Sequence, residues 1–586
     1  MSITKNRFSK LTLLKGFIFL LLMAAVLVNI KSMFTDFDGD LGYAVGMSYR
    51  MLKGDQMFAH MWEPHQTSAF LLTFFMGLYL SVTKSTTGVV LFLQGVGVLL
   101  QGILAGISFT VLKKRIDPSL ALLMSVFLFA ARPKGVVMPE FSNMHIGFSV
   151  LMFLCLLVYF ENQKKKRFLA AASICLCLQI LSYPSCLVVY FAVVMLLYLY
   201  ADNKLKDILW FSLSCLLQGT CYILFIVSNI GFTTLLENIP YILNADGTHD
   251  LLSFIRKDYF LYFGQGVLWL MVCAVAAMAS GYFLRHVCGG KLKSKVITAF
   301  GILVFFSDLI MAVVSKRHFY YGERTVYVIV YLVILCGGAA GLKFCSRQEK
   351  QMYIIGVLLT SGSFVAVFLF TNLDLLSIIG YLIVGTMISF LPLGKWLENN
   401  MPYAESAFRL MVLLLFCAMV IFRRGYITRT MNGFVIPVTD LAKSENRGMI
   451  RKGPSYGIIT DYMSAYATKY DVDEFKNFIN PGDRLFIVAV SLNALLYMYQ
   501  DVVISTPSTI CTATYNEVLL DYWEKNPEKK PNIIAVDCMD GELQIDENSW
   551  IYQWIENEFQ PGTYQDGTFW RFYYLDESPD ALKAQN

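Results

Sequence analysis

Long apolar runs recur along this chain of 586 residues, and they constrain its fold more than any other feature. A helix needs about 20 consecutive, mostly apolar residues to cross the ~30 Å hydrocarbon core of a bilayer. Only 16% of the residues are charged and 56% are hydrophobic, whereas soluble domains carry about 25% charged residues. The sequence therefore predicts an α-helical polytopic membrane protein. It disfavours a soluble enzyme, a disordered protein and a nucleic-acid-binding protein.

Charge divides the chain into two parts. Residues 1–425 carry 35 Lys and Arg against 20 Asp and Glu, whereas residues 426–586 carry 13 against 23. Short loops rich in Lys and Arg are typical of the cytoplasmic side of a membrane protein. Residues 426–586 hold no long apolar run and mix turn-forming segments with short apolar ones. We therefore expect a transmembrane domain over residues 1–425, followed by one water-soluble domain.

The apolar runs predict thirteen transmembrane helices. The first run follows four basic residues and is too long for a signal-peptide core, so we interpret it as a retained anchor with a cytoplasmic N-terminus. The expected spans are residues 11–33, 89–112, 118–131, 145–160, 168–183, 186–200, 208–229, 264–285, 296–314, 325–343, 352–371, 375–392 and 404–423.

One further apolar run, Ser68 to Thr83, has a different expected place. Its 16 residues would span roughly 24 Å as a helix, less than the bilayer core. If it lies along the outer surface, the basic loops at 113–115, 164–167, 204–206, 291–295 and 346–350 all face the cytoplasm. The first outer loop is then residues 34–88, and residues 426–586 are extracytoplasmic. The chain has no Asn-x-Ser/Thr sequon, which favours a bacterial plasma membrane.

The first outer loop begins with a cluster of acids, because Asp36, Asp38 and Asp40 fall within five residues just beyond the first span. Crowded carboxylates repel one another unless a cation, a positive ligand or a proton relieves them. Three interpretations follow from the residues alone: a divalent cation held by oxygen ligands, a general base, or a solvated loop.

The order of residues after the acids resembles the first outer loop of the GT-C superfamily of membrane glycosyltransferases. These enzymes use polyprenyl-phosphate sugars; they include the protein O-mannosyltransferases and the lipid A aminoarabinose transferases. Asp38 and Asp40 match the acidic pair of that loop, and Tyr43 with Ala44 matches its aromatic-small pair. Gly54 and Asp55 match its Gly-acid turn. The corner departs from the pattern, since Glu63-Pro64-His65-Gln66 replaces the commoner Lys-Pro-Pro-Leu.

The resemblance implies a GT-C-like fold and transfer of a sugar from a polyprenyl-phosphate donor to an acceptor on the extracytoplasmic side. Asp38 or Asp40 would interact with the acceptor hydroxyl as the general base, and the acceptor would be a lipid, a glycan or a protein. We also expect substrate contacts from other residues of this loop, namely Asp36, Tyr43, Glu63 and His65.

The second outer loop places further polar residues near the first one. Arg132 is expected to bind substrate. Members of the superfamily commonly carry a second acid in this loop, and Glu140 is the candidate here, as an acceptor or metal ligand. A divalent cation, Mg²⁺ or Mn²⁺, would then be held by Asp38, Asp40 and Glu140. The alternative for Glu140 is an exposed loop residue.

Basic and aromatic residues gather in a later outer loop, between the expected ninth and tenth spans. Positive charge is unusual on this face, and Arg suits bidentate contacts with phosphate. We therefore expect a lipid phosphate near Arg317, His318, Tyr321 and Arg324, with anionic lipid headgroups as the alternative. Asp308 lies within the ninth span, where a carboxylate costs about 2.5–3.5 kcal/mol, so it should face a cavity or a cation.

The rest of the chain predicts elements without specific site residues. Residues 231–262 form an outer loop with the pattern of a helix lying on the membrane, and loops of this length are often lids or binding elements. In the soluble part, 484–490 and 532–536 predict buried strands, and 473–478 and 515–525 predict helices. An α/β domain follows, with an accessory role in acceptor binding or packing.

Two other functions remain open at this stage. A flippase or exporter of lipid-linked sugars tends to show repeated halves and broken, charged helices at the membrane midplane. This chain shows no obvious internal repeat and concentrates its acids in one outer loop. A polysaccharide polymerase or ligase would carry its chemistry in a large late outer loop instead.

Overall fold

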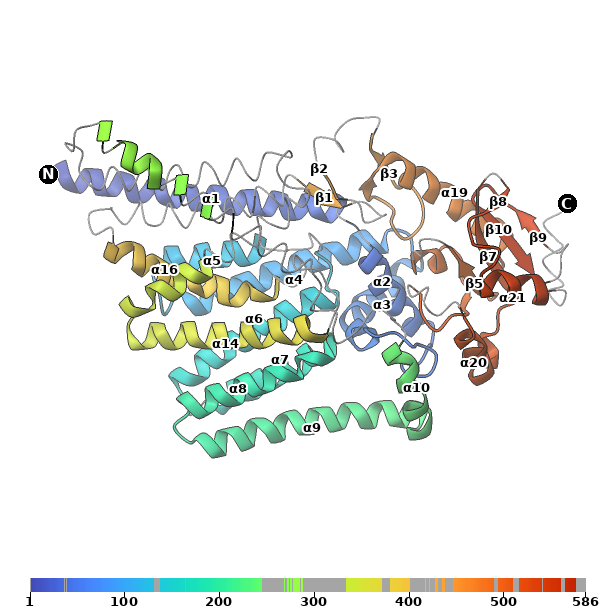
Figure 1. The fold of residues 1–586 in the computed structure, drawn as a ribbon, viewed down its shortest axis with the longest axis horizontal. Helices are drawn as coiled ribbons and strands as arrows, with labels where there is room; N and C mark the ends of the chain where they lie inside the picture. The colour runs from blue at the N-terminus through green and yellow to red at the C-terminus, as the bar shows by residue number, and fades with distance from the viewer. Residues whose placement is uncertain are drawn as a thin grey trace.

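The computed structural model describes two parts that meet at one end of a helical bundle (Figure 1). The N-terminal end of α1 lies at the far end of the bundle from the part that holds the strands. The described residues are 2–35, 37, 39–130, 137–163, 165–244, 334–370, 380–400, 427–429, 435–437, 446–489, 494–509, 516–539, 541–559 and 564–575, with isolated residues at 268–287, 417 and 421.

Apolar helices form the bundle at the positions that the sequence predicts. Within the described residues, seven helical segments are long and apolar enough to cross a membrane. The expected span 89–112 is α4, with the same bounds, and 118–131 and 186–200 agree with α5 and α8 within one residue. The helix α1 begins at Ser2 rather than at 11, and α16 covers Ile383–Asn400 rather than 375–392. The bundle helices are α1 (Ser2–Thr35), α4 (Val89–Leu112), α5 (Pro118–Ala130), α6 (Phe141–Glu161), α7 (Lys166–Ser182), α8 (Leu187–Tyr200), α9 (Lys204–Ile230), α14 (Arg347–Phe370) and α16 (Ile383–Asn400). The total of thirteen spans stays a prediction.

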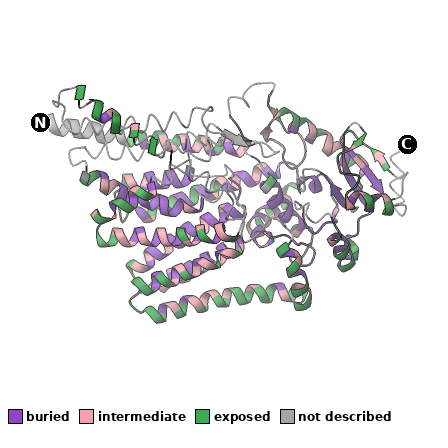
Figure 2. Cartoon of the chain, in the orientation of Figure 1, coloured by how far each residue is buried: buried purple, intermediate pink, exposed green. Residues whose placement is uncertain are grey.

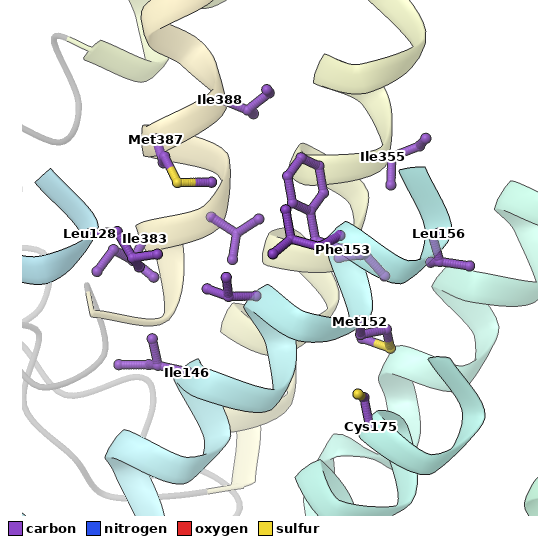
Figure 3. Close-up of a cluster of buried hydrophobic side chains, with 14 of the residues drawn as sticks. Leu128, Ile146, Met152, Phe153, Leu156, Cys175, Ile355, Ile383, Met387 and Ile388 are labelled. Atoms are coloured by element: carbon purple, nitrogen blue, oxygen red, sulfur yellow. The ribbon is translucent and has the colours of Figure 1, made fainter. Parts of the chain in front are cut away.

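Close packing of α6 against α7, α14 and α16 makes the core of the bundle. Phe153 of α6 is fully buried in the cluster that Figure 3 shows, beside Ile355 and Ile388. A Cβ added to Gly356 of α14 would lie only 2.7 Å from Ile388. Small residues let helix backbones approach closely in a membrane, where packing rather than the hydrophobic effect drives association. In Figure 2 the buried residues accordingly concentrate inside the bundle, and α9 is mostly exposed.

Three of the five expected basic loops lie together at one end of the bundle, and the loop 291–295 lies outside the described residues. Arg115, after α4, forms an ion pair with Glu161 at the end of α6. Lys166, at the start of α7, forms another with Asp207 in the first turn of α9. These ion pairs bring the three loops together, at the end of the bundle far from the sheet (Figure 1). Their cytoplasmic location stays a prediction.

The described residues of the segment 34–88 lie at the other end of the bundle (Figure 1). It contains α2 (Gly39–Leu52), the short 3₁₀ helix η1 (Gln66–Ala69) and α3 (Phe70–Thr83). Phe37, before α2, packs in the core of the soluble part. After α3, Thr86 donates a hydrogen bond to the carbonyl of Met498, 3.1 Å away. Gln66–Thr83 is 18 residues long and is one of the seven described segments that are long and apolar enough to cross a membrane, so its expected place along the outer surface stays a prediction.

The soluble part is a mixed sheet with helices, as the sequence predicts. Its strands run in the order β6-β5-β7-β10-β9, and β8 pairs with β7. β5 is parallel to β6 and β7, and β10 is antiparallel to β7 and β9. The bounds are β5 (Arg484–Val488), β6 (Val503–Ile504), β7 (Ile533–Met539), β8 (Glu542–Leu543), β9 (Tyr564–Asp566), β10 (Trp570–Tyr574), α19 (Tyr462–Phe478), α20 (Val518–Lys525), α21 (Trp550–Glu558) and the 3₁₀ helix η7 (Ala494–Met498).

Shorter elements join the two parts. Two small antiparallel pairs, β1 (Ile427–Arg429) with β2 (Val435–Pro437) and β3 (Gly448–Met449) with β4 (Ile459–Thr460), precede the sheet. A helix that lies between α9 and the soluble part, α10 (Phe232–Asn244), falls inside the expected outer loop 231–262.

Candidate functional site

The helix that follows the acidic cluster, α2, is packed between the two parts of the molecule. Tyr43 and Met47 lie one turn apart and belong to the core of the bundle. Leu41, Ala44 and Val45 point the other way, into the core of the soluble part. Because residues three and four apart share one face of a helix, this division follows from the spacing of the apolar residues. α2 is therefore held on both faces.

The structure describes only a part of the acidic cluster. Asp36 and Asp38 lie outside the described residues. Asp40 is the second residue of α2, and its side chain also lies outside them. The later residues expected to bind substrate are outside as well: Arg132, Asp308, Arg317, His318, Tyr321 and Arg324.

An aromatic cluster links the first outer loop to the bundle, and it contains two of the expected residues. The ring of His65 stacks on Phe141, with centroids 4.4 Å apart and an interplanar angle of 8°. Tyr183 meets the same imidazole edge-on at 5.1 Å, and Tyr43 does so at 6.5 Å. Tyr381 meets Tyr183 at 5.9 Å. We call these five residues the aromatic cluster; it brings together α2, the loop corner, α6 and the segments before α8 and α16.

Glu140 caps the helix that contributes Phe141. Its two carboxylate oxygens accept hydrogen bonds of 2.8 Å from the amides of Ser142 and Asn143. A carboxylate at a helix N-terminus satisfies amides that have no partner within the helix. Glu140 is also buried, so the alternative of an exposed loop residue is wrong. Beside it, the hydroxyl of Ser142 accepts a hydrogen bond of 3.1 Å from Tyr381.

A second group, the interdomain clasp, joins the first outer loop to the soluble part. We define it as Arg50, Asp55, Glu63, Thr509 and Lys529. Arg50, in the last turn of α2, is fully buried and donates a 2.8 Å hydrogen bond from Nε to Asp55. Lys529 binds the other oxygen of that carboxylate.

Glu63 supplies the rest of the clasp, and its carboxylate is fully buried. Its oxygens accept hydrogen bonds of 2.8 Å from the backbone amide of Thr509 and from the hydroxyl of Ser508. Nη1 of Arg50 lies 3.5 Å from Oε1 of Glu63 and donates a hydrogen bond to the carbonyl of Pro507. Glu63 was expected to bind substrate, and the structure places it in contact between the two parts of the molecule.

Burial and charge act against each other on the two acids of the clasp. Burial alone would raise the pKa of Asp55, but the cations of Arg50 and Lys529 hold it below its ordinary value. For Glu63, burial dominates and raises the pKa, although Arg50, Ser508 and Thr509 favour the ionised form. The clasp therefore depends on Arg50, because this one cation faces both carboxylates.

Sequence reasoning did not single out Arg50, Lys529 or the segment 505–509. The sequence feature that could have indicated these contacts is the corner Glu63-Pro64-His65-Gln66, because it departs from the Lys-Pro-Pro-Leu of the resembled family. Two residues of this corner make separate contacts, Glu63 with the soluble part and His65 with the aromatic cluster.

The described residues do not by themselves provide a metal site. No group of three His, Cys, Asp or Glu side chains within them could hold a metal ion. Of the three expected ligands, only the side chain of Glu140 is described, and its oxygens already accept two amide hydrogen bonds. One carboxylate is too few ligands for Mg²⁺ or Mn²⁺, so a metal site here would also need the side chains of Asp38 and Asp40, which lie outside the described residues.

Comparison with known proteins gives similarity to solved structures only. No protein-family model matches the chain, and no curated protein does. An oligosaccharyltransferase from Archaeoglobus fulgidus, in a complex with Zn and sulfate, is 11% identical with a TM-score of 0.43, covering 88% of this chain and 68% of that one. The enzyme AglB of that organism was also solved with an inhibitory peptide and a dolichol-phosphate, and it gives a TM-score of 0.40 at 11% identity, covering 89% of this chain and 69% of that one.

ArnT from Cupriavidus metallidurans is similar over nearly its whole length. Its apo structure is 11% identical with a TM-score of 0.40, covering 95% of this chain and 98% of that one. The structure of ArnT bound to undecaprenyl phosphate has the same coverage and identity and a TM-score of 0.36.

Proposed function

We propose that this protein is a membrane glycosyltransferase that moves a sugar from a polyprenyl-phosphate donor to an acceptor hydroxyl. Asp38 or Asp40 is the general base. The observation that carries the proposal is the position of α2, which follows the acidic cluster and is packed between the bundle and the soluble part. A base must be held in a fixed place relative to the proton it takes, and a helix buried on two faces provides that.

Helix register supports a role for Asp40. It lies one turn before Tyr43 in α2, so the two positions share one helix face. Tyr43 belongs to the aromatic cluster and to the core of the bundle. A site between these aromatic rings and the membrane surface would exclude water from the reaction.

The proposed reaction needs few protein groups. The acceptor oxygen attacks the anomeric carbon of the donor, and the bond from that carbon to the phosphate oxygen breaks. The phosphate leaves with the electron pair of that bond, and the proton of the acceptor hydroxyl passes to the Asp carboxylate. A phosphate is already a good leaving group, so the protein mainly has to deprotonate the acceptor and stabilise phosphate charge. We assign that second task to Arg317 and Arg324, with Arg132.

The proposal includes the orientation of the chain in the membrane and a divalent cation in the site. With the basic loops in the cytoplasm, the first outer loop and the soluble domain 426–586 lie outside, next to the donor phosphate. A divalent cation held by Asp38, Asp40 and Glu140 would neutralise phosphate charge. Removing free cations with a chelator should then lower the transfer rate, and adding Mg²⁺ or Mn²⁺ back should restore it.

A transfer assay in vesicles separates this proposal from a flippase or exporter. The purified chain is reconstituted with a synthetic polyprenyl-phosphate sugar and an extract of envelope lipids and glycans as acceptors. A transferase releases free polyprenyl phosphate and forms a new glycoside, both measurable by mass spectrometry. Movement of the intact donor between leaflets without release of polyprenyl phosphate would contradict the proposal.

A further inference from the structure

Helix α10 separates its residues into two faces of different character. Phe232, Leu236 and Leu243 are 60%, 51% and 72% exposed, and their spacing of four and seven residues places them on one face. Tyr241 lies on the opposite face, where its ring stacks on Trp62 with centroids 4.4 Å apart and an angle of 15°. Apolar side chains that gather on one exposed face, opposite a face with polar contacts, are typical of a surface that contacts a membrane or another protein. We call Phe232, Leu236 and Leu243 the apolar stripe.

The face of α10 that carries Tyr241 makes polar contacts with the soluble part and with the first outer loop. The hydroxyl of Tyr241 donates a 3.0 Å hydrogen bond to Asp521 of α20. Glu237 forms an ion pair of 3.0 Å with Lys525, which is also in α20. Asn238 donates to the backbone carbonyl of Phe58 at 2.8 Å. These contacts fix the direction in which the apolar stripe faces.

The position of α10 in the chain indicates what covers the stripe. It follows α9 after a single residue, Gly231, whose φ of 82° turns the chain. α9 is apolar enough to cross a membrane and exposes large apolar side chains along its length, including Leu209, Leu216 and Phe225. The stripe thus begins where a lipid-facing helix ends.

A protein partner fits this surface less well. Stable protein interfaces bury about 800 Å² on each partner, and a stripe of three side chains is much smaller than that. An amphipathic helix at a membrane surface instead buries its apolar side chains about 5–10 Å into the boundary between headgroups and acyl chains.

We infer that α10 binds the lipid surface on the side of the soluble part through Phe232, Leu236 and Leu243. With its other face it holds the soluble part and the Trp62 corner against that surface. The inference does not depend on the proposed reaction, because it rests on the exposure, contacts and chain position of α10.

Photo-crosslinking in the full chain tests this inference. Benzoylphenylalanine is placed at Leu236 or at Leu243, and the protein is reconstituted in vesicles of phosphatidylcholine and phosphatidylglycerol and irradiated. Leu209 of α9 is the positive control, and Met539, which is 55% exposed on β7, is the negative control. Lipid adducts at both α10 positions, comparable in yield with those at Leu209 and absent at Met539, are the expected result.

Two results would overturn the inference. A crosslinked dimer in place of lipid adducts would show that a second copy of the chain covers the stripe. An absence of adducts at both α10 positions, while Leu209 reacts, would show that the stripe does not reach lipid. Thermal melting of each labelled protein verifies that the fold is retained.

Discussion

Arg50 is a single buried cation that faces two buried carboxylates, Asp55 and Glu63. Replacing one partner of a buried ion pair leaves the other charge without compensation, which costs about 3–5 kcal/mol. We expect Arg50→Met to lower the stability of the soluble part by that amount. Urea titration of the full chain in detergent, followed by tryptophan fluorescence, measures the change.

Arg571 provides the matched control for this prediction. It pairs with Asp566 at 2.6 Å at a partly exposed site on the sheet. Because exposed ion pairs contribute about 0–1 kcal/mol, Arg571→Met should have a small effect. Equal losses in the two variants would show that Arg50 has no special place in the clasp.

Asp471 makes the stability of the soluble part depend on pH. Burial of its carboxyl is the largest cause that raises its pKa to about 7; the hydrogen bond from Trp570 opposes this, and the charges of Glu474 and Asp537 add to it. The unfolded value is about 3.9, so the folded state binds more protons between these values and stability falls as pH rises from about 4 to 7. We expect Asp471→Asn to remove this fall and to melt higher than the wild type at pH 8.

A neighbouring acid on the same helix is the control for the pH prediction. Asp473 pairs with Lys452 at 2.5 Å at a half-exposed site. Melting temperatures between pH 4.5 and 8 should follow the wild-type trend in Asp473→Asn. A wild-type trend in Asp471→Asn as well would mean that another group causes the pH dependence.

At the scale of elements, α2 and η7 approach each other closely and link the two parts of the molecule. A Cβ added to Gly46 of α2 would lie 2.7 Å from the Cβ of Ala494. Overpacking of this kind typically costs about 1–3 kcal/mol. Gly46→Ala should therefore lower the melting temperature of the full chain and increase proteolysis between its two parts.

Gly106 of α4 is a suitable control for Gly46. Nothing lies within 4 Å of a Cβ added there, and alanine is a better helix former than glycine. Gly106→Ala should leave the melting temperature unchanged or raise it slightly. A Gly46→Ala variant as stable as the wild type would contradict the close approach of α2 and η7.

Single elements could be predicted from the sequence, whereas their contacts could not. The apolar run 89–112 and the expected strand 484–490 correspond to α4 and β5, because a continuous apolar run and its length predict both elements locally. The contact of Glu63 with Thr509 joins residues 446 positions apart, and no local pattern encodes such a pair. The amphipathic helix of the outer loop 231–262 was expected, but its stacking on Trp62 was not.

The candidate site follows the same rule. A pattern of residue types identified the first outer loop and the segment at Glu140, and the structure brings Tyr43, His65 and Phe141 together. The burial of Glu63 could not be predicted, because an acid in a polar loop ordinarily faces water. Its cation, Arg50, lies in a helix whose pattern marks it only as amphipathic.

At the scale of the whole molecule, the segment after α3 tests which side of the membrane carries the soluble part. Ser85 is exposed near the soluble part, and Lys114 is exposed at the basic end of the bundle. In intact cells, a membrane-impermeant maleimide should label Ser85→Cys, whereas it should label Lys114→Cys only after the cells are permeabilised. If Ser85→Cys is labelled only after permeabilisation, the soluble part lies on the cytoplasmic side.

The rate of sugar transfer in Asp38→Asn and Asp40→Asn tests the proposed reaction most directly. Rates are measured in vesicles with a saturating polyprenyl-phosphate sugar, and Glu542→Gln, an exposed acid on β8, is the control. Loss of a general base costs about 10²–10⁴-fold, so at least one Asp variant should lose that much activity while it binds donor and melts like the wild type. Wild-type rates in both Asp variants would contradict a role for this acidic cluster in the chemistry.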